Sequence, residues 1–219
     1  MSEAVDYYAN HRLKLRFPWR LYHRPIVEGL ARVLREGPGG PALNVGSGPF
    51  LELRELPEAG WRWSVCDIDP RAVEAARGLH GEALEDARTL EVGAPLPYPD
   101  GAFALVTSMD VIEHVPEPAP WLAELVRVLR PGGRIYLTTP NYGRTSTLPL
   151  IEATVLELIA RSQGFSRREL HPSRFDCRRL TEVMECAGLS AVEVHARSLG
   201  WVLSGTARKP QTKADAPDA

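Results

Sequence analysis

The feature that most constrains the fold is a regular alternation of short apolar runs and amphipathic segments between residues 25 and 139. Apolar runs bounded by glycine or proline are typical of buried strands, and apolar residues repeated every three or four positions are typical of helices. We expect strands at 41–46, 61–67, 88–92, 103–109 and 134–139, and helices at 25–36, 70–79 and 118–129. This alternation predicts a mostly parallel sheet with helices on both faces.

The chain on either side of this alternation is expected to complete one domain. The predicted parts are an N-terminal arm (1–24), an insert (141–175), a helix (176–187), two strands (189–196 and 200–207) and a disordered tail (209–219). Proline lacks a helix donor, so we expect Pro18 to break the arm and Pro25 to open the first helix. Residues 1–208 are thus predicted to form a single α/β domain with a doubly wound, Rossmann-like, mostly parallel seven-stranded sheet.

Composition excludes several classes of protein. Among the 219 residues, 26 Lys and Arg balance 28 Asp and Glu, so no basic excess points to nucleic acid. The sequence has no run of 18 apolar residues, so we expect no stable insertion into a membrane. The three cysteines form no C-x-x-C pair, which favours reduced thiols in the cytoplasm over a disulfide framework or zinc. We also predict no metal, because no tight carboxylate–histidine cluster stands out.

The segment LNVGSGPFLEL, which follows the first expected strand, carries two glycines that let the backbone turn tightly and approach a ligand. Such a turn lies at the carboxyl edge of a doubly wound sheet, where these folds bind ligands. Asp67 ends the second strand, 21 residues after Gly46, and its carboxylate can accept hydrogen bonds from both hydroxyls of a ribose. The glycines alone would only make a turn, but together with Asp67 they predict a nucleoside site.

The same spacing also suits NAD, which makes an NAD-linked reductase a weaker alternative. A dinucleotide loop has a third glycine where this chain has Leu51, and Pro49 removes a backbone donor that a diphosphate would use. The Tyr-x-x-x-Lys pair of such reductases is also missing, since Tyr142 is followed at that spacing by Ser146.

Four motifs, LPYPDGAF, DVIEHV, ELVRVLRPGG and TPN, follow one another after LNVGSG and VCDIDPRAVEAA. As a set they resemble the class I S-adenosylmethionine-dependent methyltransferases, and more narrowly the branch of ubiquinone-biosynthesis-type and related small-molecule enzymes. The resemblance covers roughly residues 25–205. It implies S-adenosyl-L-methionine as cofactor, S-adenosyl-L-homocysteine as product, and methyl transfer to oxygen, nitrogen or carbon of a small-molecule acceptor by a monomer or homodimer.

The resemblance also implies roles for the matched positions. Gly46, Ser47 and Gly48 would wrap the methionine part of the cofactor. Asp67 would hold the ribose, and Ile68 would pack on the adenine. The other implied cofactor contacts are Asn44 in the first strand, Gly93 and Ala94 at the adenine edge, and the backbone carbonyls of Met109 and Asp110 toward the amino group.

Three positions depart from the family's pattern. Asn44 and Ala104 stand where the family usually has acids, and the acid that ends the third strand has no clear match apart from the nearby Glu91. An amide still accepts a hydrogen bond but carries no charge. A cofactor-binding regulator, or a degenerate enzyme without turnover, is therefore the alternative function.

Methyl transfer from a sulfonium is an in-line displacement, so the protein mainly supplies placement and a dry pocket. A base is needed only where the acceptor must lose a proton, and His114 is the candidate catalytic base, with ordering of the EHVP turn as its alternative role. The residues expected to select the acceptor border the arm and the insert: Tyr7, His11, Asn141, Tyr142, His171 and Arg174. Arginines clustered there are either a solvated face or a sign of an acidic acceptor.

Overall fold

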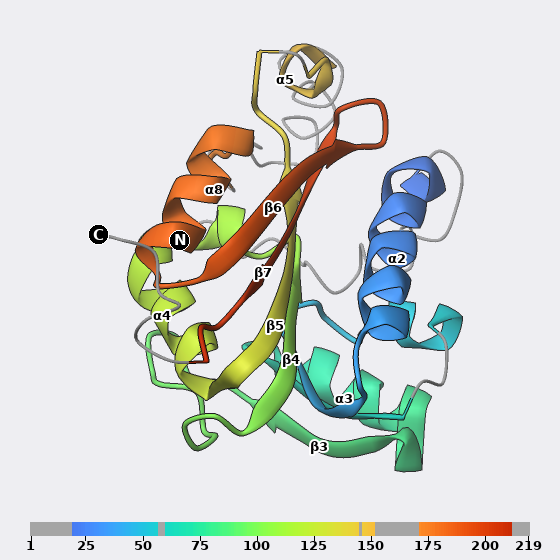
Figure 1. Ribbon diagram of the computed structural model, residues 1–219. Helices are drawn as coiled ribbons and strands as arrows, with labels where there is room; N and C mark the ends of the chain where they lie inside the picture. Colours follow the sequence, from blue (N-terminus) through green and yellow to red (C-terminus); the bar gives the residue numbers. More distant parts are fainter. Residues whose placement is uncertain (1–18, 57–59, 145, 152–170, 212–219) are drawn as a thin grey trace.

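The computed structural model describes residues 19–56, 60–144, 146–151 and 171–211. Its centre is a seven-stranded sheet with the strand order β3-β2-β1-β4-β5-β7-β6 (Figure 1). The strands are β1 (Gly40–Val45), β2 (Trp61–Asp67), β3 (Leu84–Thr89), β4 (Phe103–Met109), β5 (Leu129–Pro140), β6 (Ser190–Arg197) and β7 (Val202–Arg208). Strand β7 runs antiparallel to β5 and β6, and the other pairs are parallel. The predicted Rossmann-like sheet is confirmed.

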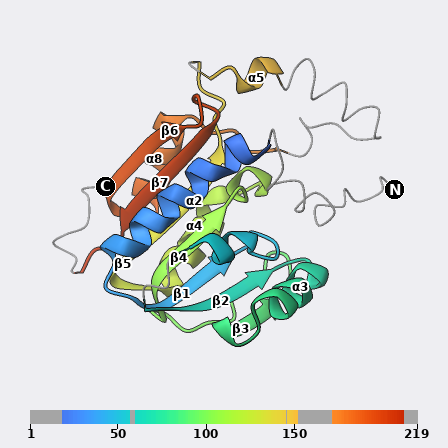
Figure 2. The same ribbon diagram turned by 90° about the vertical axis from the view of Figure 1, so that its right-hand side faces the viewer.

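Helices cover both faces of the sheet, as the alternation predicts (Figure 2). On one face, α2 (Trp19–Glu36) and α3 (Pro70–His80) share a core cluster with the central strands. On the other face, α4 (Pro118–Val128) and α8 (Cys177–Cys186) share a second cluster. Successive residues of a strand point to opposite faces, so the central strands contribute side chains to both core clusters.

The shorter elements lie mainly at the strand ends. They are α5 (Leu148–Ile151) and the 3-10 turns η1 (Leu51–Glu55), η2 (Gly81–Ala83) and η3 (Ile112–His114). Within the part of the chain that the structure describes, no helix has the length and apolarity needed to cross a bilayer.

Helix α2 begins at Trp19 and passes through Pro25, so the helix start predicted at Pro25 is wrong, and the end of the predicted arm belongs to this helix. Proline removes one helix hydrogen bond, but burial outweighs that loss, because Ile26 and Leu30 lie in the core against the sheet. The Tyr136 hydroxyl also donates a hydrogen bond of 2.8 Å to the Ile26 carbonyl. This contact ties α2 to β5.

Strand β3 covers Leu84–Thr89 and not 88–92 as predicted. Ala87 is buried in the core, whereas Val92 is 85% exposed, so the apolar residues after Thr89 do not extend the sheet. The chain turns there instead, and the Ala94 N–H donates to the Glu91 carbonyl at 3.1 Å.

Strand β5 begins at Leu129, earlier than predicted, because Leu129 already pairs with Phe103 across a register shift. The predicted tail at 209–219 also begins too early. The Lys209 N–H donates to the Gly133 carbonyl at 3.0 Å, and the Lys209 ammonium donates to the Leu129 carbonyl at 2.8 Å. Lys209 thus anchors the end of β7 on β5, and most of the predicted tail lies outside the described residues.

Candidate functional site

The order of the sheet reverses between β1 and β4, since the chain builds β2 and β3 on one side of β1 and the later strands on the other. In doubly wound sheets, ligands bind at the carboxyl ends of the strands at such a switch point. The glycine loop follows β1 at this place. Gly46 has a φ of +74°, and a Cβ added there would lie 3.0 Å from the Val111 side chain. The loop therefore needs glycine for its turn and for its close approach to Val111.

Buried polar side chains behind the loop hold its shape. The Asn44 amide donates to the hydroxyl oxygens of Ser47 at 3.1 Å and Thr107 at 3.0 Å. The same Ser47 oxygen accepts a hydrogen bond of 3.1 Å from the backbone N–H of Met109. A carboxylate has no N–H to donate, so the amide at position 44 is matched to these hydroxyls. Ala104, the other departure from the family's pattern, lies near the start of β4, at the opposite strand end.

The Asp67 carboxylate joins the end of β2 to the glycine loop. Its Oδ2 accepts a hydrogen bond of 2.9 Å from the Gly48 N–H, and its Oδ1 accepts one of 2.9 Å from the Asp69 N–H. Asp67 is 8% exposed, and this burial raises the pKa of its carboxyl although the backbone donors act in the opposite direction. A buried acceptor thus stands where the sequence predicts the ribose contact.

Two exposed aliphatic side chains come shortly after the ends of the adjacent strands β2 and β3. The Leu90 N–H donates to the Asp67 carbonyl at 2.8 Å, which brings the chain after β3 beside the end of β2. Ile68 is 59% exposed and Val92 is 85% exposed. Exposed aliphatic groups at this edge suit a flat apolar ligand. The remaining predicted positions of the edge are also exposed: Gly93 and Ala94. The sequence analysis did not name Val92 as a candidate ligand contact. An aliphatic residue in a polar turn is the pattern that could have indicated it.

The chain turns sharply after β4 at Asp110, whose φ of +55° lies in the left-handed region that is costly for a non-glycine residue. The hydroxyls of Thr138 and Tyr22 donate to its Oδ1 at 3.1 Å and 3.3 Å. Burial, followed by the carboxylates of Asp110 and Glu113, raises the pKa of Tyr22, so this phenol stays a protonated donor. Sequence reasoning missed Tyr22, because α2 meets β4 only in the folded chain.

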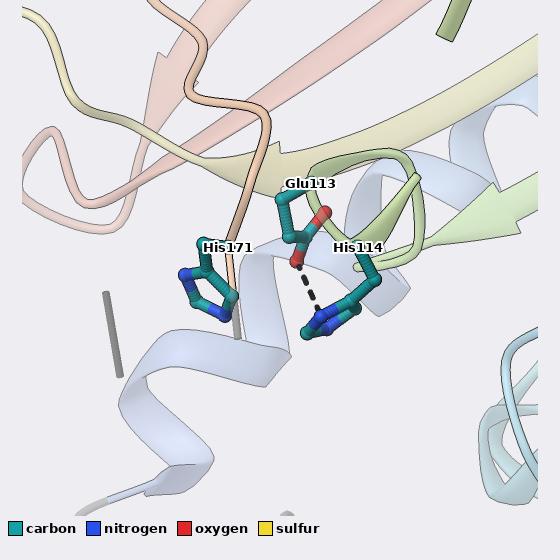
Figure 3. A group of neighbouring side chains, drawn as sticks. All are labelled: Glu113, His114 and His171. Atoms are coloured by element: carbon teal, nitrogen blue, oxygen red, sulfur yellow. Dashed lines mark ion pairs between the residues drawn. The ribbon is translucent and has the colours of Figure 1, made fainter. Parts of the chain in front are cut away.

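His114 ends η3 and lies beside Glu113 and His171 (Figure 3). The buried Glu113 accepts a hydrogen bond of 2.9 Å from the Thr139 hydroxyl at Oε2. Its Oε1 lies 3.9 Å from Nε2 of His114. The His114 and His171 rings meet edge to face, with their centroids 4.9 Å apart. Two residues predicted for different roles are therefore neighbours.

This cluster has the composition of a metal site. One ligand atom from each of Glu113, His114 and His171 lies within 4.8 Å of the others. Imidazole and carboxylate groups are ligands of divalent transition metals, so these residues could hold an ion. The prediction that the chain has no carboxylate–histidine cluster is wrong. His171 is far from the EHV motif in sequence and reaches it only through the path of the folded chain.

Tyr142 and Arg174, both predicted to contact the acceptor, lie together next to this cluster. The Tyr142 hydroxyl is hydrogen-bonded to Nδ1 of His171 at 2.5 Å. The Arg174 guanidinium lies 5.1 Å from the centre of the Tyr142 ring, within range of a cation–π contact. A groove of about 240 Å³ opens beside them and is lined by Tyr142, Pro149, Arg174, Phe175, Asp176 and Arg179. The surface next to the cluster is therefore aromatic and partly basic.

Not every predicted acceptor residue joins this group. The Asn141 side chain donates to the Gly200 carbonyl at 2.7 Å and accepts from the Gly143 N–H at 2.8 Å. These bonds give Asn141 a role in shaping the chain after β5. Tyr7 and His11 lie outside the described residues.

A family profile described as a methyltransferase domain matches residues 43–137. A ubiquinone biosynthesis O-methyltransferase of Xanthomonas oryzae pv. oryzae (strain PXO99A) is 33% identical over 125 residues, which are 56% of this chain and 52% of that protein. The chain thus spans about half the length of this relative.

Solved structures share the fold at low identity. A chain from the complex of the Haloferax volcanii Trm112 methyltransferase activator with a methyltransferase gives a TM-score of 0.68 at 19% identity, over 92% of this chain and 94% of that chain. The Burkholderia thailandensis 1,6-didemethyltoxoflavin-N1-methyltransferase, solved with 1,6-didemethyltoxoflavin and S-adenosylhomocysteine, gives a TM-score of 0.64 at 18% identity. That match covers 93% of this chain and 84% of the other. At these identities the likeness shows the fold alone.

Proposed function

From the match of residues 43–137 to the methyltransferase domain profile, we propose that the chain is a methyltransferase of this family, binds S-adenosyl-L-methionine and methylates a small molecule. S-adenosyl-L-homocysteine would be the second product. The Xanthomonas relative is named for O-methylation in ubiquinone biosynthesis, and the Burkholderia structure is that of an N1-methyltransferase. Oxygen, nitrogen and carbon acceptors are all open for this chain. Its cytoplasmic location and its monomeric or homodimeric state stay predictions.

The observation that carries this proposal is the position of Asp67. Its carboxylate lies at the switch-point edge, hydrogen-bonded to Gly48 of the glycine loop at 2.9 Å. Ile68 directly follows Asp67. Val92 comes two residues after Leu90, whose N–H donates to the Asp67 carbonyl. Both aliphatic side chains are exposed. A nucleoside needs an acceptor for its ribose hydroxyls and an apolar surface for its base. This chain offers both within one edge of the sheet.

Each part of the cofactor can be assigned to residues at this edge of the sheet. We assign Gly46, Ser47 and Gly48 to its methionine part, Asp67 to the ribose and Ile68 to the adenine. The remaining proposed contacts are Asn44, Gly93, Ala94, and the backbone carbonyls of Met109 and Asp110. When bound, S-adenosyl-L-methionine supplies a methyl group already activated on a sulfonium.

The chain itself then has two tasks, which are to orient the acceptor and to deal with its proton. Tyr142, His171 and Arg174 border the acceptor side and are proposed to orient it. His114 is proposed to take the proton of an acidic hydroxyl or ammonium acceptor as a general base. Its side chain is 30% exposed, and its Nε2 lies 3.9 Å from Oε1 of Glu113.

Calorimetric titration of the full chain tests the proposal, with S-adenosylmethionine, S-adenosylhomocysteine and NAD as ligands. We expect the two adenosyl ligands to bind at a single site and NAD to bind far more weakly. Binding of NAD alone would overturn the proposal. Single-turnover assays with a labelled methyl group, over a panel of phenols, amines and carboxylates, then identify the acceptor atom.

A second candidate is a cofactor-binding protein without turnover. The hydrogen bonds of Asn44 behind the glycine loop favour this candidate. The Asn44 amide nitrogen donates hydrogen bonds to Ser47 and Thr107, where the family usually has a charged group. The labelled-methyl assay separates the two candidates. Transfer to any acceptor removes the second, and tight cofactor binding with no transfer over the whole panel supports it.

A further inference from the structure

The Glu113–His114–His171 cluster combines three potential metal ligands from two distant parts of the chain. Glu113 and His171 are buried, and His114 is partly exposed. In Figure 3 the carboxylate and the two rings point toward a common space, with one nitrogen of His171 facing the other two residues. A buried carboxylate is costly unless positive charge or strong donors surround it. A buried carboxylate beside two imidazoles can serve as the charged ligand of a cation.

The separations are close to those of a bound ion. Ligand atoms that share an ion at 2.0–2.2 Å lie about 3 to 3.5 Å from one another. In this structure the Glu113 Oε1 and His114 Nε2 atoms are 3.9 Å apart, and all three ligand atoms lie within 4.8 Å of one another. Bringing ligand atoms that lie at most 4.8 Å apart to about 3.5 Å would close the set around an ion.

Neighbouring groups already orient the ligands. The Tyr142 hydroxyl is hydrogen-bonded to Nδ1 of His171, and the Thr139 hydroxyl donates to Oε2 of Glu113. Ligating histidines in metal sites commonly use one nitrogen for such a partner and the other for the metal. The Tyr142 bond therefore directs Nε2 of His171 toward the shared space.

Backbone contacts hold the two parts of the cluster together. The Ser173 N–H donates to the Glu113 carbonyl at 3.1 Å, and the Ser173 hydroxyl donates to the Val115 carbonyl at 2.7 Å. These bonds fix the chain near His171 against the turn that carries Glu113 and His114. The three ligands are thus positioned by the fold and not by side-chain contact alone.

We propose that Glu113, His114 and His171 bind one divalent transition-metal ion of the Zn²⁺ type and leave a coordination position for an oxygen of the acceptor. Two imidazoles and a carboxylate form a ligand set that suits such ions better than Mg²⁺, which prefers oxygen. The ion site stands on geometry alone. Its role toward the acceptor rests on the proposed function.

The ion would change how the acceptor loses its proton. A ring nitrogen that binds a metal cannot accept a proton, so in the loaded protein His114 acts as a ligand, and the general-base role belongs to the metal-free form. A bound cation lowers the pKa of a coordinated hydroxyl. With the cofactor bound, the hydroxyl proton would pass to water, and the acceptor oxygen would form its bond to the methyl carbon as the sulfur–methyl bond breaks. The inferred acceptor is therefore a hydroxyl compound.

The test is titration of the chelator-treated full chain with Co²⁺, a spectroscopic substitute for Zn²⁺, followed by visible absorbance and calorimetry. The variants are Glu113→Gln, His114→Gln and His171→Gln. The matched control is His195→Gln, because His195 and Glu193 form a similar pair, with Nε2 and Oε2 3.8 Å apart, on the exposed strand β6. Circular dichroism and thermal melts without metal check that each variant folds.

We expect one Co²⁺ per chain, an affinity loss of about 100-fold or more in each ligand variant, and no change in His195→Gln. A smaller loss, of about 10-fold, is expected for Tyr142→Phe, since outer partners tune metal affinity by 10- to 100-fold. Absence of Co²⁺ binding, or binding that the folded His114→Gln variant leaves unchanged, overturns the inference. His114 is the most exposed ligand, so this variant is decisive if the two buried ones do not fold.

The same samples keep this inference apart from the proposed function. Each is also titrated with S-adenosylhomocysteine. Binding of the adenosyl ligand without Co²⁺ binding overturns the metal site alone. Co²⁺ binding without adenosyl binding overturns the proposed function and leaves the ion site standing.

Discussion

The proposed cofactor edge and the proposed acceptor side of this molecule are built in different ways. The cofactor edge consists of backbone turns directly after β1, β2 and β4, with Asp67 as its principal charged side chain. The acceptor side consists of side chains from η3, from the chain after β5 and from residue 171. The first is continuous with the sheet, whereas the second is assembled from segments that meet only in the folded protein.

This difference decides which changes each region tolerates. A backbone turn at the end of a strand is fixed by the sheet, so it depends on a few residues with special conformations or a single charge. A side-chain cluster depends on every segment that brings its members together. Substitutions at the cofactor edge should therefore act on adenosyl binding and leave the metal ligands intact, and the reverse should hold on the acceptor side.

The largest effect is expected for Asp67→Ala. Hydrogen bonds to a buried charged group contribute about 1.5 to 3 kcal/mol each, so losing two ribose bonds should weaken S-adenosylhomocysteine binding by about 100- to 20,000-fold. Calorimetry measures the loss, and Glu74→Gln, an exposed acid on α3, is the matched control. Co²⁺ binding should stay unchanged in both. Adenosyl affinity that Asp67→Ala does not alter would remove the basis of the proposed function.

Adenosyl binding should also depend on pH through Asp67. Burial raises the pKa of this carboxyl, and only the ionised form accepts both ribose hydrogen bonds, so affinity should fall about tenfold per unit as the pH drops below that pKa. The ligand-free protein should respond in the opposite direction. A raised pKa in the folded state adds stability below the unfolded pKa, and this stability is lost as the pH rises through the folded pKa.

Calorimetry and urea denaturation between pH 4 and 8 measure the two slopes. Asp67→Asn has no carboxyl to titrate, and both slopes should be smaller in it. Equal slopes in the variant and the parent would assign the pH dependence to other groups.

The next effect concerns the turn itself. Gly46→Ala places a side chain at a φ of +74° and 3.0 Å from Val111, which should cost about 1 to 3 kcal/mol of stability and distort the loop. The control is Gly78→Ala in α3, where an added Cβ meets nothing within 4 Å. That change should stabilise the protein by about 0.5 to 1 kcal/mol. Urea denaturation checks both, and equal effects would show that the turn places no special demand on residue 46.

The same contrast explains what the sequence could predict. The sheet, the glycine loop and Asp67 follow from short-range patterns, because the end of a parallel strand fixes where the next residues lie. Asp69, which directly precedes the proline that opens α3, also caps this helix by accepting a hydrogen bond of 2.9 Å from the Arg71 N–H. Local hydrogen bonding decides these features, so a single sequence is enough to find them.

Other features depend on contacts that no local pattern contains. Pro25 lies inside α2 because the helix packs on β5, and Lys209 is ordered because it caps carbonyls at the start of that strand. Tyr22 and His171 reach their partners across the whole domain. A cluster of potential metal ligands built from such residues has no fixed spacing, which is why the sequence predicts none.

The smallest predicted effect tests the apolar part of the cofactor edge. Ile68→Ser and Val92→Ser each remove an exposed aliphatic group beside Asp67, and covering such a group contributes about 1 kcal/mol, so each change should weaken S-adenosylhomocysteine binding about fivefold. Leu199→Ser is the matched control, because Leu199 is 86% exposed in the turn between β6 and β7. Stability should hardly change in any of the three, since the side chains are exposed in the ligand-free protein.

The two variants also sharpen the comparison between the regions. Ile68 follows the end of β2, which the sequence predicts correctly. Val92 lies after β3, in a segment that the sequence predicts to be part of the strand. Equal losses would mean that the cofactor edge extends across β2 and β3 as one apolar surface. A loss confined to Ile68→Ser would limit the edge to residues that directly follow β2, and a loss in Leu199→Ser would show that the assay responds to surface polarity in general.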